Sequence, residues 1–343
     1  MAKKKTKKGL ILSLVGFVVT GSMVALGAYL VMYAPNVKKD GFLFIPTGST
    51  YRQVQDSLQK HDFLENPAHF ETWQRVKKYY EHVKPGRYEL RKGMTNRQLV
   101  NILRSGQQTP IRVTFNNFRT LEQLAERVSI AIEADSASLM AAFLCPDFLE
   151  RSGFSRQTVK AMFIPNTYEL WWTTTATQFV ERMRLEHERF WTEERRKKAT
   201  ARNLTPIQVS ILASIIEEET NKHSEKPLMA SVYINRLRRG MKLQADPTVK
   251  YAIGDFGLRR ILFVHLRHDS PFNTYMYAGL PPGPICAPSV ITLDAVLNSP
   301  QTDYLFFCAR EDFSGYHNFA RTHAEHTQNA RRYHEELNRR RIR

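Results

Sequence analysis

The feature that most constrains the fold is a long uncharged stretch near the N-terminus. Gly9–Ala34 contains no charged residue. As a helix it is long enough to cross the hydrocarbon core of a bilayer, which is about 30 Å thick, with some tilt. The preceding residues, MAKKKTKK, are rich in lysine, whereas the nearest basic residues beyond the stretch are Lys38 and Lys39. This asymmetry predicts a cytoplasmic tail over 1–8, a transmembrane helix over 9–34, and the rest of the chain outside the cytoplasm.

The alternative is a cleaved signal peptide with its cleavage site at Ala25-Leu26-Gly27. That site is a poor match, the apolar stretch is longer than a typical signal-peptide core, and no lipid-attachment cysteine follows it. An uncleaved membrane anchor is therefore predicted.

The region after the apolar stretch contains an internal repeat. The run GSTYRQV at 48–54 recurs as GMTNRQL at 93–99, and a fainter third copy, TLEQL, lies at 120–124. Each copy follows a short apolar run, FLFIP, GRYEL or IRVTF, so each predicts a strand, a turn and a helix with a threonine N-cap. With a helical stretch at Ala68–His82 between the first two copies, residues 41–110 are expected to form a small β-α-α-β unit.

The segment LTPIQVSILASIIEEETNK predicts a helix with an unusual carboxylate. Thr205 is a favourable N-cap, and Pro206 suits the first helical position. At about 100° per residue, the isoleucine, leucine and valine side chains form one broad arc. Glu219 falls near the middle of this arc, Glu218 at its edge, and Glu217 on the other side with the serines.

A carboxylate on the core-facing side of a helix needs an explanation. If it is buried and unpaired, it costs several kcal/mol unless it stays protonated or finds partners. One interpretation is that the helix frays and all three glutamates are solvated. The other is that Glu219 is a carboxylic acid with a raised pKa, able to donate a proton.

Composition and motif content exclude several classes of protein. The chain is 42% hydrophobic and 24% charged, as in globular proteins, and carries a net charge of +17. No zinc-finger, helix-turn-helix or RNA-binding motif is present, so no nucleic acid partner is expected, and anionic lipid or acidic wall polymers fit the charge better. No nucleophile elbow or phosphate loop is found. His323-Ala-Glu325-His326 lacks a further ligand at typical spacing, so neither a metal nor another cofactor is expected.

The three cysteines, Cys145, Cys286 and Cys308, show no metal-binding spacing. Their odd number prevents complete pairing, and they are expected to pack as small apolar residues.

Five short motifs follow one another in the C-terminal half. They are E-x-E-T at 217–220, N-R-L at 235–237, L-Q-x-D-P-T-V at 243–249, N-T-Y at 273–275 and G-L-P-P-G-P-I at 279–285. Their order resembles the endolytic murein transglycosylase (YceG-like) family, bacterial inner-membrane enzymes that cut peptidoglycan glycan strands. The likeness runs from the apolar stretch to His326 and is strongest over 205–320.

The resemblance implies an α+β fold with an anchor helix, a LysM-like βααβ subdomain at 41–110, a helical connection at 111–204 and a mixed α/β catalytic domain at 205–343. LysM domains bind glycans that contain N-acetylglucosamine, but the repeat itself shows only a fold, and a spacer is as plausible as a binding module.

The implied activity is cleavage of the β-1,4 bond between N-acetylmuramic acid and N-acetylglucosamine, with 1,6-anhydromuramyl ends, which would terminate nascent strands. The implied setting is the cell inner membrane, with the catalytic domain in the periplasm. Peptidoglycan strands, the membrane and peptidoglycan synthases are the expected partners.

Glu219 is the expected catalytic acid. The candidate substrate-binding residues share positions in or beside the family motifs: Asn235, Arg236, Gln244, Asp246, Asn273, Tyr275 and His317. Each has a structural alternative, because Asp246 could be an N-cap, the amides and Arg236 could fix turns, and a lone histidine is more often structural. The family usually has aspartate where this chain has Asn166, so the role of that carboxylate is in doubt.

Two rival functions remain at this stage. A muramidase would use water in place of an internal hydroxyl group, and an inactive scaffold would only bind the wall. The complete motif set argues against the scaffold, since glycan binding alone does not need a buried acid.

Overall fold

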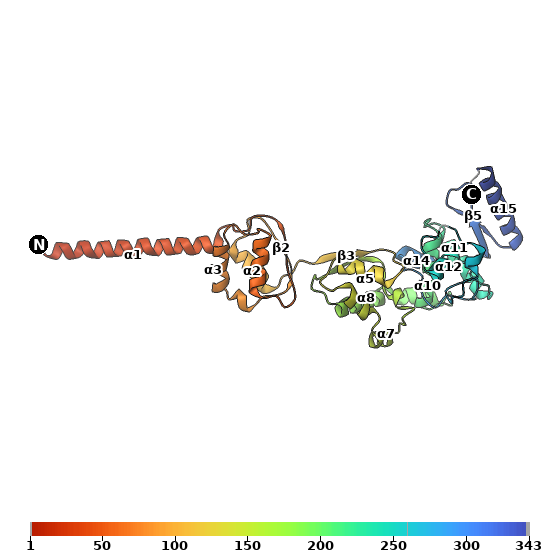
Figure 1. The fold of residues 1–343 in the computed structure, drawn as a ribbon, viewed down its shortest axis with the longest axis horizontal. Helices are drawn as coiled ribbons and strands as arrows, with labels where there is room; N and C mark the ends of the chain where they lie inside the picture. Colours follow the sequence, from red (N-terminus) through yellow and green to blue (C-terminus); the bar gives the residue numbers. More distant parts are fainter. Residues whose placement is uncertain (1, 259, 341–343) are drawn as a thin grey trace. The chain divides into compact units, whose positions relative to one another are not determined.

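The computed structural model describes residues 2–258 and 260–340, with side chains from residue 10 onward (Figure 1). The chain divides into two compact units. Unit 1 comprises Met1–Arg112, Ala131–Glu133 and Glu169–Thr174, and unit 2 comprises Val113–Ile130, Ala134–Tyr168 and Thr175–Arg343. The domain boundaries expected at 110 and 204 stay predictions.

The apolar stretch is one continuous helix, α1 (Ala2–Tyr33). Within its segment Leu10–Tyr33, a window of 18 residues has a mean hydropathy of 2.2, and none of that window is buried inside the protein. It is therefore long and apolar enough to cross a membrane, as the sequence predicts.

The predicted β-α-α-β order is present in unit 1. Strand β1 pairs with β2 in an antiparallel two-stranded sheet, with Gly41 opposite Leu90 and Ile45 opposite Gly86. The predicted helix at 68–82 is shorter, because it ends at Val76 and a 3₁₀ turn follows. The elements are β1 (Gly41–Ile45), α2 (Tyr51–Lys60), α3 (Pro67–Val76), η1 (Tyr79–Glu81), β2 (Gly86–Leu90) and α4 (Asn96–Ser105).

The three predicted threonine N-caps are confirmed at α2, α4 and α5 (Leu121–Ser129). In each, the threonine side chain accepts a hydrogen bond from the backbone N–H three residues on, and the glutamine there returns a bond to the cap backbone. These capping boxes satisfy two N–H groups at each helix start. The repeat residues Leu58, Leu103 and Val128 are fully buried.

The structure reveals a fourth copy of this repeat. Strand β4 (Asn166–Leu170) and helix α8 (Ala176–Phe190) carry Y-E-L, then threonine and glutamine, at the spacing found in β2 and α4, and α8 also opens with a capping box. β4 pairs with β3 (Ile111–Phe115). The connection over 111–204, which was expected to be helical after the strand predicted at IRVTF, therefore also contains the strand β4.

Helix α10 (Pro206–Glu219) lies at the centre of unit 2 and packs against α9, α11, α12, α14 and η2. Because neighbours surround it, every residue from Val209 to Ile216 is buried, including Ser210 and Ser214. The expected polar side of this helix is therefore wrong over its middle. Ser214 instead accepts a hydrogen bond from the backbone N–H of Ile285 at 3.0 Å.

The remaining elements of unit 2 include a small antiparallel sheet, with Phe306 of β5 opposite Ala320 of β6. Met241–Leu243 and the proline-rich segment Gly279–Ile285 are irregular. These elements are α6 (Ser136–Phe143), α7 (Pro146–Ser152), η2 (Val159–Met162), α9 (Glu193–Thr200), α11 (Lys226–Arg238), α12 (Asp246–Ile253), α13 (Phe263–Leu266), α14 (Val290–Leu297), β5 (Phe306–Ala309), β6 (His317–Ala320) and α15 (His323–Arg339).

Candidate active site

The last turn of α10 holds three consecutive glutamates, and the first is part of a buried ion pair. Glu217 lies 2.9 Å from Nζ of the buried Lys226, and it also accepts hydrogen bonds from the hydroxyls of Ser289 and Thr292. Burial opposes its ionisation, but the hydrogen bonds from Thr292 and Lys226 outweigh it and lower the pKa of Glu217. The expectation that Glu217 lies on the polar side is wrong, and its charge is used to join α10 to α11 and α14.

Glu218 forms a second ion pair. Arg119 donates to its carboxylate with Nη2 at 2.6 Å and Nε at 3.3 Å, and Asn117 donates from its amide at 3.1 Å. Both partners follow β3, so this pair fixes the end of α10 to the turn before α5.

Glu219 differs from both neighbours. Its carboxyl group accepts a hydrogen bond from the Tyr233 hydroxyl at 2.8 Å. Burial, and to a lesser degree the charge of Asp246, raise the pKa of Glu219 to about 7, against the opposing effects of Tyr233 and Lys250. Among the described side chains, no lysine or arginine lies within ion-pair distance of it. A carboxylic acid that keeps its proton to near neutral pH can serve as a general acid.

Glu219 lines a cavity of about 300 Å³, so its proton is accessible to a ligand. The lining residues come from α10, α11, the segment before α12, the first residue of α12, the turn at 273–277, β5 and α15: Glu219, Tyr233, Arg236, Leu243, Gln244, Asp246, Tyr275, Phe307 and His326. A wider groove of about 1050 Å³ shares Glu219 and Asp246 and extends past Lys250, Arg260 and Tyr333. Such an open groove can accept a polymer.

The N-cap interpretation of Asp246 is wrong. Helix α12 starts at Asp246, its N-cap is Ala245, and no side chain caps it. The Asp246 carboxylate instead accepts a hydrogen bond from the Tyr275 hydroxyl at 2.7 Å. A second carboxylate therefore lies in the cavity with Glu219.

Two other predicted residues, Arg236 and Gln244, also line the cavity. The buried Arg236 guanidinium donates from Nε to the carbonyl of Leu305 at 2.7 Å and from Nη1 to that of Leu243 at 2.9 Å. Gln244 adopts a left-handed backbone conformation with φ of 51°. Arg236 thus fixes the backbone beside Gln244 and also presents a cation to the cavity. Its role in substrate binding stays a prediction.

The other three predicted residues support the site from outside the cavity lining. The Asn235 amide donates to the carbonyls of Thr302 and Tyr304 at 2.7 and 3.0 Å. The Asn273 amide donates to those of Leu266 and His268 at 3.0 and 2.8 Å. His317 pairs with Glu225 through Nδ1 at 3.0 Å. The exposed Asn166 also lies outside the lining, and its side chain accepts from the N–H of Thr167.

Sequence reasoning missed four lining residues, which are Tyr233, Leu243, Phe307 and His326. Tyr233 lies one turn before Arg236 on an apparently apolar helix face, which is a weak signal. Nothing local identifies His326, because the packing of α15 against β5 brings it to the cavity. Within the described part of the chain, no group of three or more histidine, cysteine, aspartate or glutamate side chains could hold a metal ion.

The proline-rich segment is bonded to α10 and to η2. Besides the bond from Ile285 to Ser214, the buried Lys160 donates to the carbonyl of Pro284 at 3.0 Å and to the Tyr251 hydroxyl at 2.9 Å. Burial lowers the pKa of Lys160 to about 8. A Cβ at Gly283 would lie 2.0 Å from the carbonyl oxygen of Gln157, so only glycine fits there. Ile285 of this rigid segment lines a small separate pocket beside Glu218.

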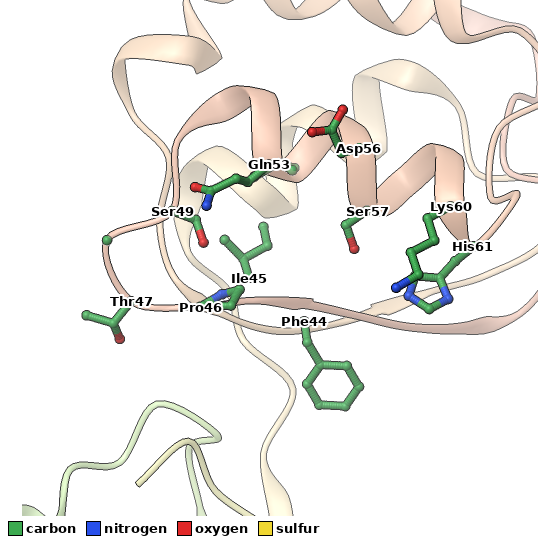
Figure 2. Close-up of a pocket in the computed structure, with 12 residues that line it drawn as sticks. Phe44, Ile45, Pro46, Thr47, Ser49, Gln53, Asp56, Ser57, Lys60 and His61 are labelled. Carbon is green, nitrogen blue, oxygen red and sulfur yellow. The ribbon is translucent and has the colours of Figure 1, made fainter. Parts of the chain in front are cut away.

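Unit 1 contains a cavity of its own, about 480 Å³ in volume, between β1, the following turn and α2 (Figure 2). The exposed ring of Phe44 lies at its edge, and Asp56, Ser57, Lys60 and His61 of the α2 region contribute polar groups. Phe44 contacts Trp172 edge-on, with ring centroids 5.2 Å apart. An aromatic ring beside hydrogen-bonding groups suits a ligand with both apolar and polar faces.

Comparison with known proteins identifies relatives over most of the chain. The model of the YceG-like family matches residues 43–332. The chain is 27% identical to an endolytic murein transglycosylase of Bacillus subtilis over 84% of this chain and 83% of that protein. It is 28% identical to an endolytic murein transglycosylase of Streptococcus pneumoniae over 80% of this chain, which spans 55% of that longer protein.

A solved structure has the same fold. The crystal structure of a YceG-like protein from Listeria monocytogenes aligns with a TM-score of 0.56 at 26% identity, covering 84% of this chain and 98% of that one.

Proposed function

The chain belongs to the YceG-like family, and on this premise we propose that it is a membrane-anchored endolytic lytic transglycosylase of peptidoglycan. The observation that carries the proposal is Glu219, a carboxyl group with a pKa of about 7 that lines an open groove and has no basic partner among the described side chains. Breaking a glycosidic bond requires an acid that protonates the leaving oxygen, and Glu219 meets this requirement.

In the proposed reaction, Glu219 first donates its proton to the glycosidic oxygen between N-acetylmuramic acid and N-acetylglucosamine, and the C1–O bond breaks. The resulting carboxylate then removes the proton from the C6 hydroxyl of the same muramyl residue as that oxygen attacks C1. The product is a 1,6-anhydro ring, and Glu219 is again protonated. Since nucleophile and electrophile belong to one sugar, proximity supplies much of the rate.

The remaining lining residues have supporting roles in this proposal. Tyr233 orients the Glu219 carboxyl group, and Gln244, Tyr275 and Arg236 offer hydrogen bonds to the acetamido and lactyl groups of the substrate. We assign the exclusion of water during the attack of the hydroxyl to the rigid proline-rich segment, whose Ile285 lines a small pocket beside Glu218.

A muramidase is the second candidate, and Asp246 is the observation that favours it. Glycosidases that use water commonly have two carboxyl groups, one acting as acid and the other as base or nucleophile. Asp246 lies in the same cavity as Glu219 and influences its pKa. However, Asp246 already accepts a hydrogen bond from Tyr275, and substrate-assisted cleavage requires Glu219 alone.

The products distinguish these reactions. We expect purified peptidoglycan digested by the full-length chain in ¹⁸O-labelled water to yield muramyl ends that are lighter than hydrolysed ends by one water and carry no label. Asp246→Asn should still form these ends if Glu219 acts alone. Labelled reducing ends that disappear in Asp246→Asn would show that the muramidase is correct. Mass spectrometry of the sugar ends gives the answer.

We also propose that α1 stays attached, that the rest of the chain lies in the periplasm, and that the enzyme terminates nascent strands beside peptidoglycan synthases. The lysine-rich tail and the apolar Leu10–Tyr33 segment support this orientation. A reporter active only outside the cytoplasm should be active when fused after Arg343. Activity of a cytoplasm-only reporter at the same position would exclude the orientation.

Finally, we propose that residues 41–110 are LysM-like and that the cavity beside Phe44 holds a glycan. The βααβ order and the exposed aromatic edge support this. Phe44→Ala should weaken cosedimentation with insoluble peptidoglycan, whereas Phe42→Ala should not. Phe42 is a matched control, since both rings are 41% exposed on β1 and Phe42 stacks under Arg87 instead. Equal binding by both variants would leave unit 1 as a spacer.

A further inference from the structure

Unit 2 exposes three consecutive large apolar side chains, which we call the apolar rim. Leu262, Phe263 and Val264 are 51%, 88% and 69% exposed. Isolated apolar residues are normal on protein surfaces, but a contiguous exposed group containing an aromatic ring marks a contact surface.

The apolar rim is held in an ordered turn. The backbone N–H groups of His265 and Leu266 donate to the carbonyl of Leu262 at 2.9 and 3.3 Å. The carbonyls of Leu266 and His268, which follow the rim, accept hydrogen bonds from the fully buried Asn273 amide. The protein thus uses a buried polar side chain to fix a segment whose apolar side chains face solvent.

The charges within the ten-residue segment that carries the rim have one sign, and the first acidic residue after it is Asp269. The sequence from Arg259 to His268 reads RRILFVHLRH and contains no acidic residue. Arg260 precedes the apolar rim and Arg267 follows it along the chain, and both are exposed. Apolar and aromatic side chains flanked by arginines match the interface of an anionic bilayer, where rings enter the headgroup region and guanidinium groups meet phosphates.

The rim also has a fixed relation to the groove. Arg260 and Ile261, which immediately precede it, line the groove that contains Glu219. Whatever binds the apolar rim therefore lies at one edge of the candidate active site.

We propose that the apolar rim inserts into the anionic phospholipid surface of the membrane that α1 spans, as a second membrane contact. This requires the membrane anchor but not the proposed reaction. The favoured occupant is lipid because the flanking charge complements phosphate and because the same chain carries a membrane-spanning helix candidate. A protein partner or a second copy of the chain is the alternative that the experiment must separate.

The test uses the full-length chain reconstituted into vesicles of phosphatidylcholine and phosphatidylglycerol with brominated acyl chains, which quench nearby tryptophan. Phe263→Trp adds a reporter at the rim, and wild type gives the background of the native tryptophans. Ile130→Trp is the matched control, because Ile130 is also 88% exposed and lies in the same unit. We expect the added fluorescence of Phe263→Trp to fall at least about twofold, since an interfacial segment enters the bilayer by about 5–10 Å.

Further variants identify the forces involved. Val264→Glu in the Phe263→Trp background should remove most of the quenching, and so should vesicles without phosphatidylglycerol. High salt should reduce the part of the quenching that depends on charge, because it screens the attraction between arginine and phosphate. Quenching of Phe263→Trp no greater than that of Ile130→Trp would overturn the proposal. So would a response that depends on protein density and not on brominated lipid, since this would indicate a second copy. Cleavage of detergent-dispersed glycan fragments by Val264→Glu should equal wild type, which separates this test from that of the reaction.

Discussion

Glu219→Gln is expected to reduce glycan cleavage by about 10²–10⁴-fold, the usual range for loss of a general acid or base. Glutamine keeps the shape of the side chain and can still interact with Tyr233, but it has no transferable proton. The loss should appear in kcat, measured as the rate of release of muramyl ends from purified peptidoglycan at saturating substrate.

The matched control is Glu218→Gln, the same chemical change at the neighbouring residue. Glu218 is paired with the half-exposed Arg119, and such pairs contribute about 1 kcal/mol or less. This variant should therefore keep most of its activity. Near-normal cleavage by Glu219→Gln together with loss in Glu218→Gln would show that the wrong carboxyl group has been assigned.

The raised pKa of Glu219 gives this prediction a pH dependence. Above about pH 7 the wild-type acid loses its proton, so kcat should fall as the pH rises through this value. Between the ordinary value of 4.5 and about 7, the folded state holds a proton that the unfolded state releases. The stability contributed by this group is therefore present below 4.5 and is lost as the pH rises to 7. Glutamine does not ionise, so Glu219→Gln does not lose this stability as the pH rises. At pH 8 the variant should therefore be at least as stable as wild type, and unfolding would not explain its inactivity.

Lys226→Met is expected to lower the free energy of unfolding by about 3–5 kcal/mol, because it leaves Glu217 as a buried charge without its cation. Lys226 is 2% exposed, and its ammonium group bonds to both Glu217 and Thr292. Thermal denaturation, followed by the fluorescence of Trp191 in the unit 2 core, measures the effect. The exposed Lys242→Met is the control and should change stability little.

A double variant tests the cause of this loss. Glu217→Met with Lys226→Met removes both charges, and apolar side chains of similar size often replace a buried ion pair at little cost. The double variant should therefore regain much of the stability. A cost of less than about 1 kcal/mol for Lys226→Met alone would mean that the pair is solvated. The different roles given to the three glutamates, two in ion pairs and one as a proposed acid, would then need revision.

The features predicted correctly from the sequence are those that depend on neighbours along the chain. The threonine caps at Thr50, Thr95 and Thr120 and the start of α10 at Thr205 follow from local hydrogen bonding. The pairing of β3 with β4 was missed because the Y-E-L repeat at Tyr168 lies within an aromatic segment and lacks the glycine of the first two copies.

The candidate site was predicted less completely because segments far apart in the sequence meet there. A helical wheel assigns one inner side to α10, but five elements surround it. Ser214 is therefore buried as well, and Glu217 is half-buried. Asp246 has the sequence of an N-cap, yet its helix begins one residue earlier than that role requires. His326 reaches the cavity only through the packing of α15, which no local pattern encodes.

The acidic end of α10 has a consequence for how this region forms. A helix has a partial negative charge at its C-terminus, where cations are favourable and carboxylates are not. The last turn of α10 contains Glu217, Glu218 and Glu219 and no basic residue. The charges of Glu217 and Glu218 are neutralised by Lys226 and Arg119, which come from other segments. Glu219 is uncharged as long as it keeps its proton, which its raised pKa favours. As an isolated peptide, α10 would fray at this end at neutral pH. We therefore expect the turn that carries the proposed acid to become fully helical when its partners dock, together with the core around it.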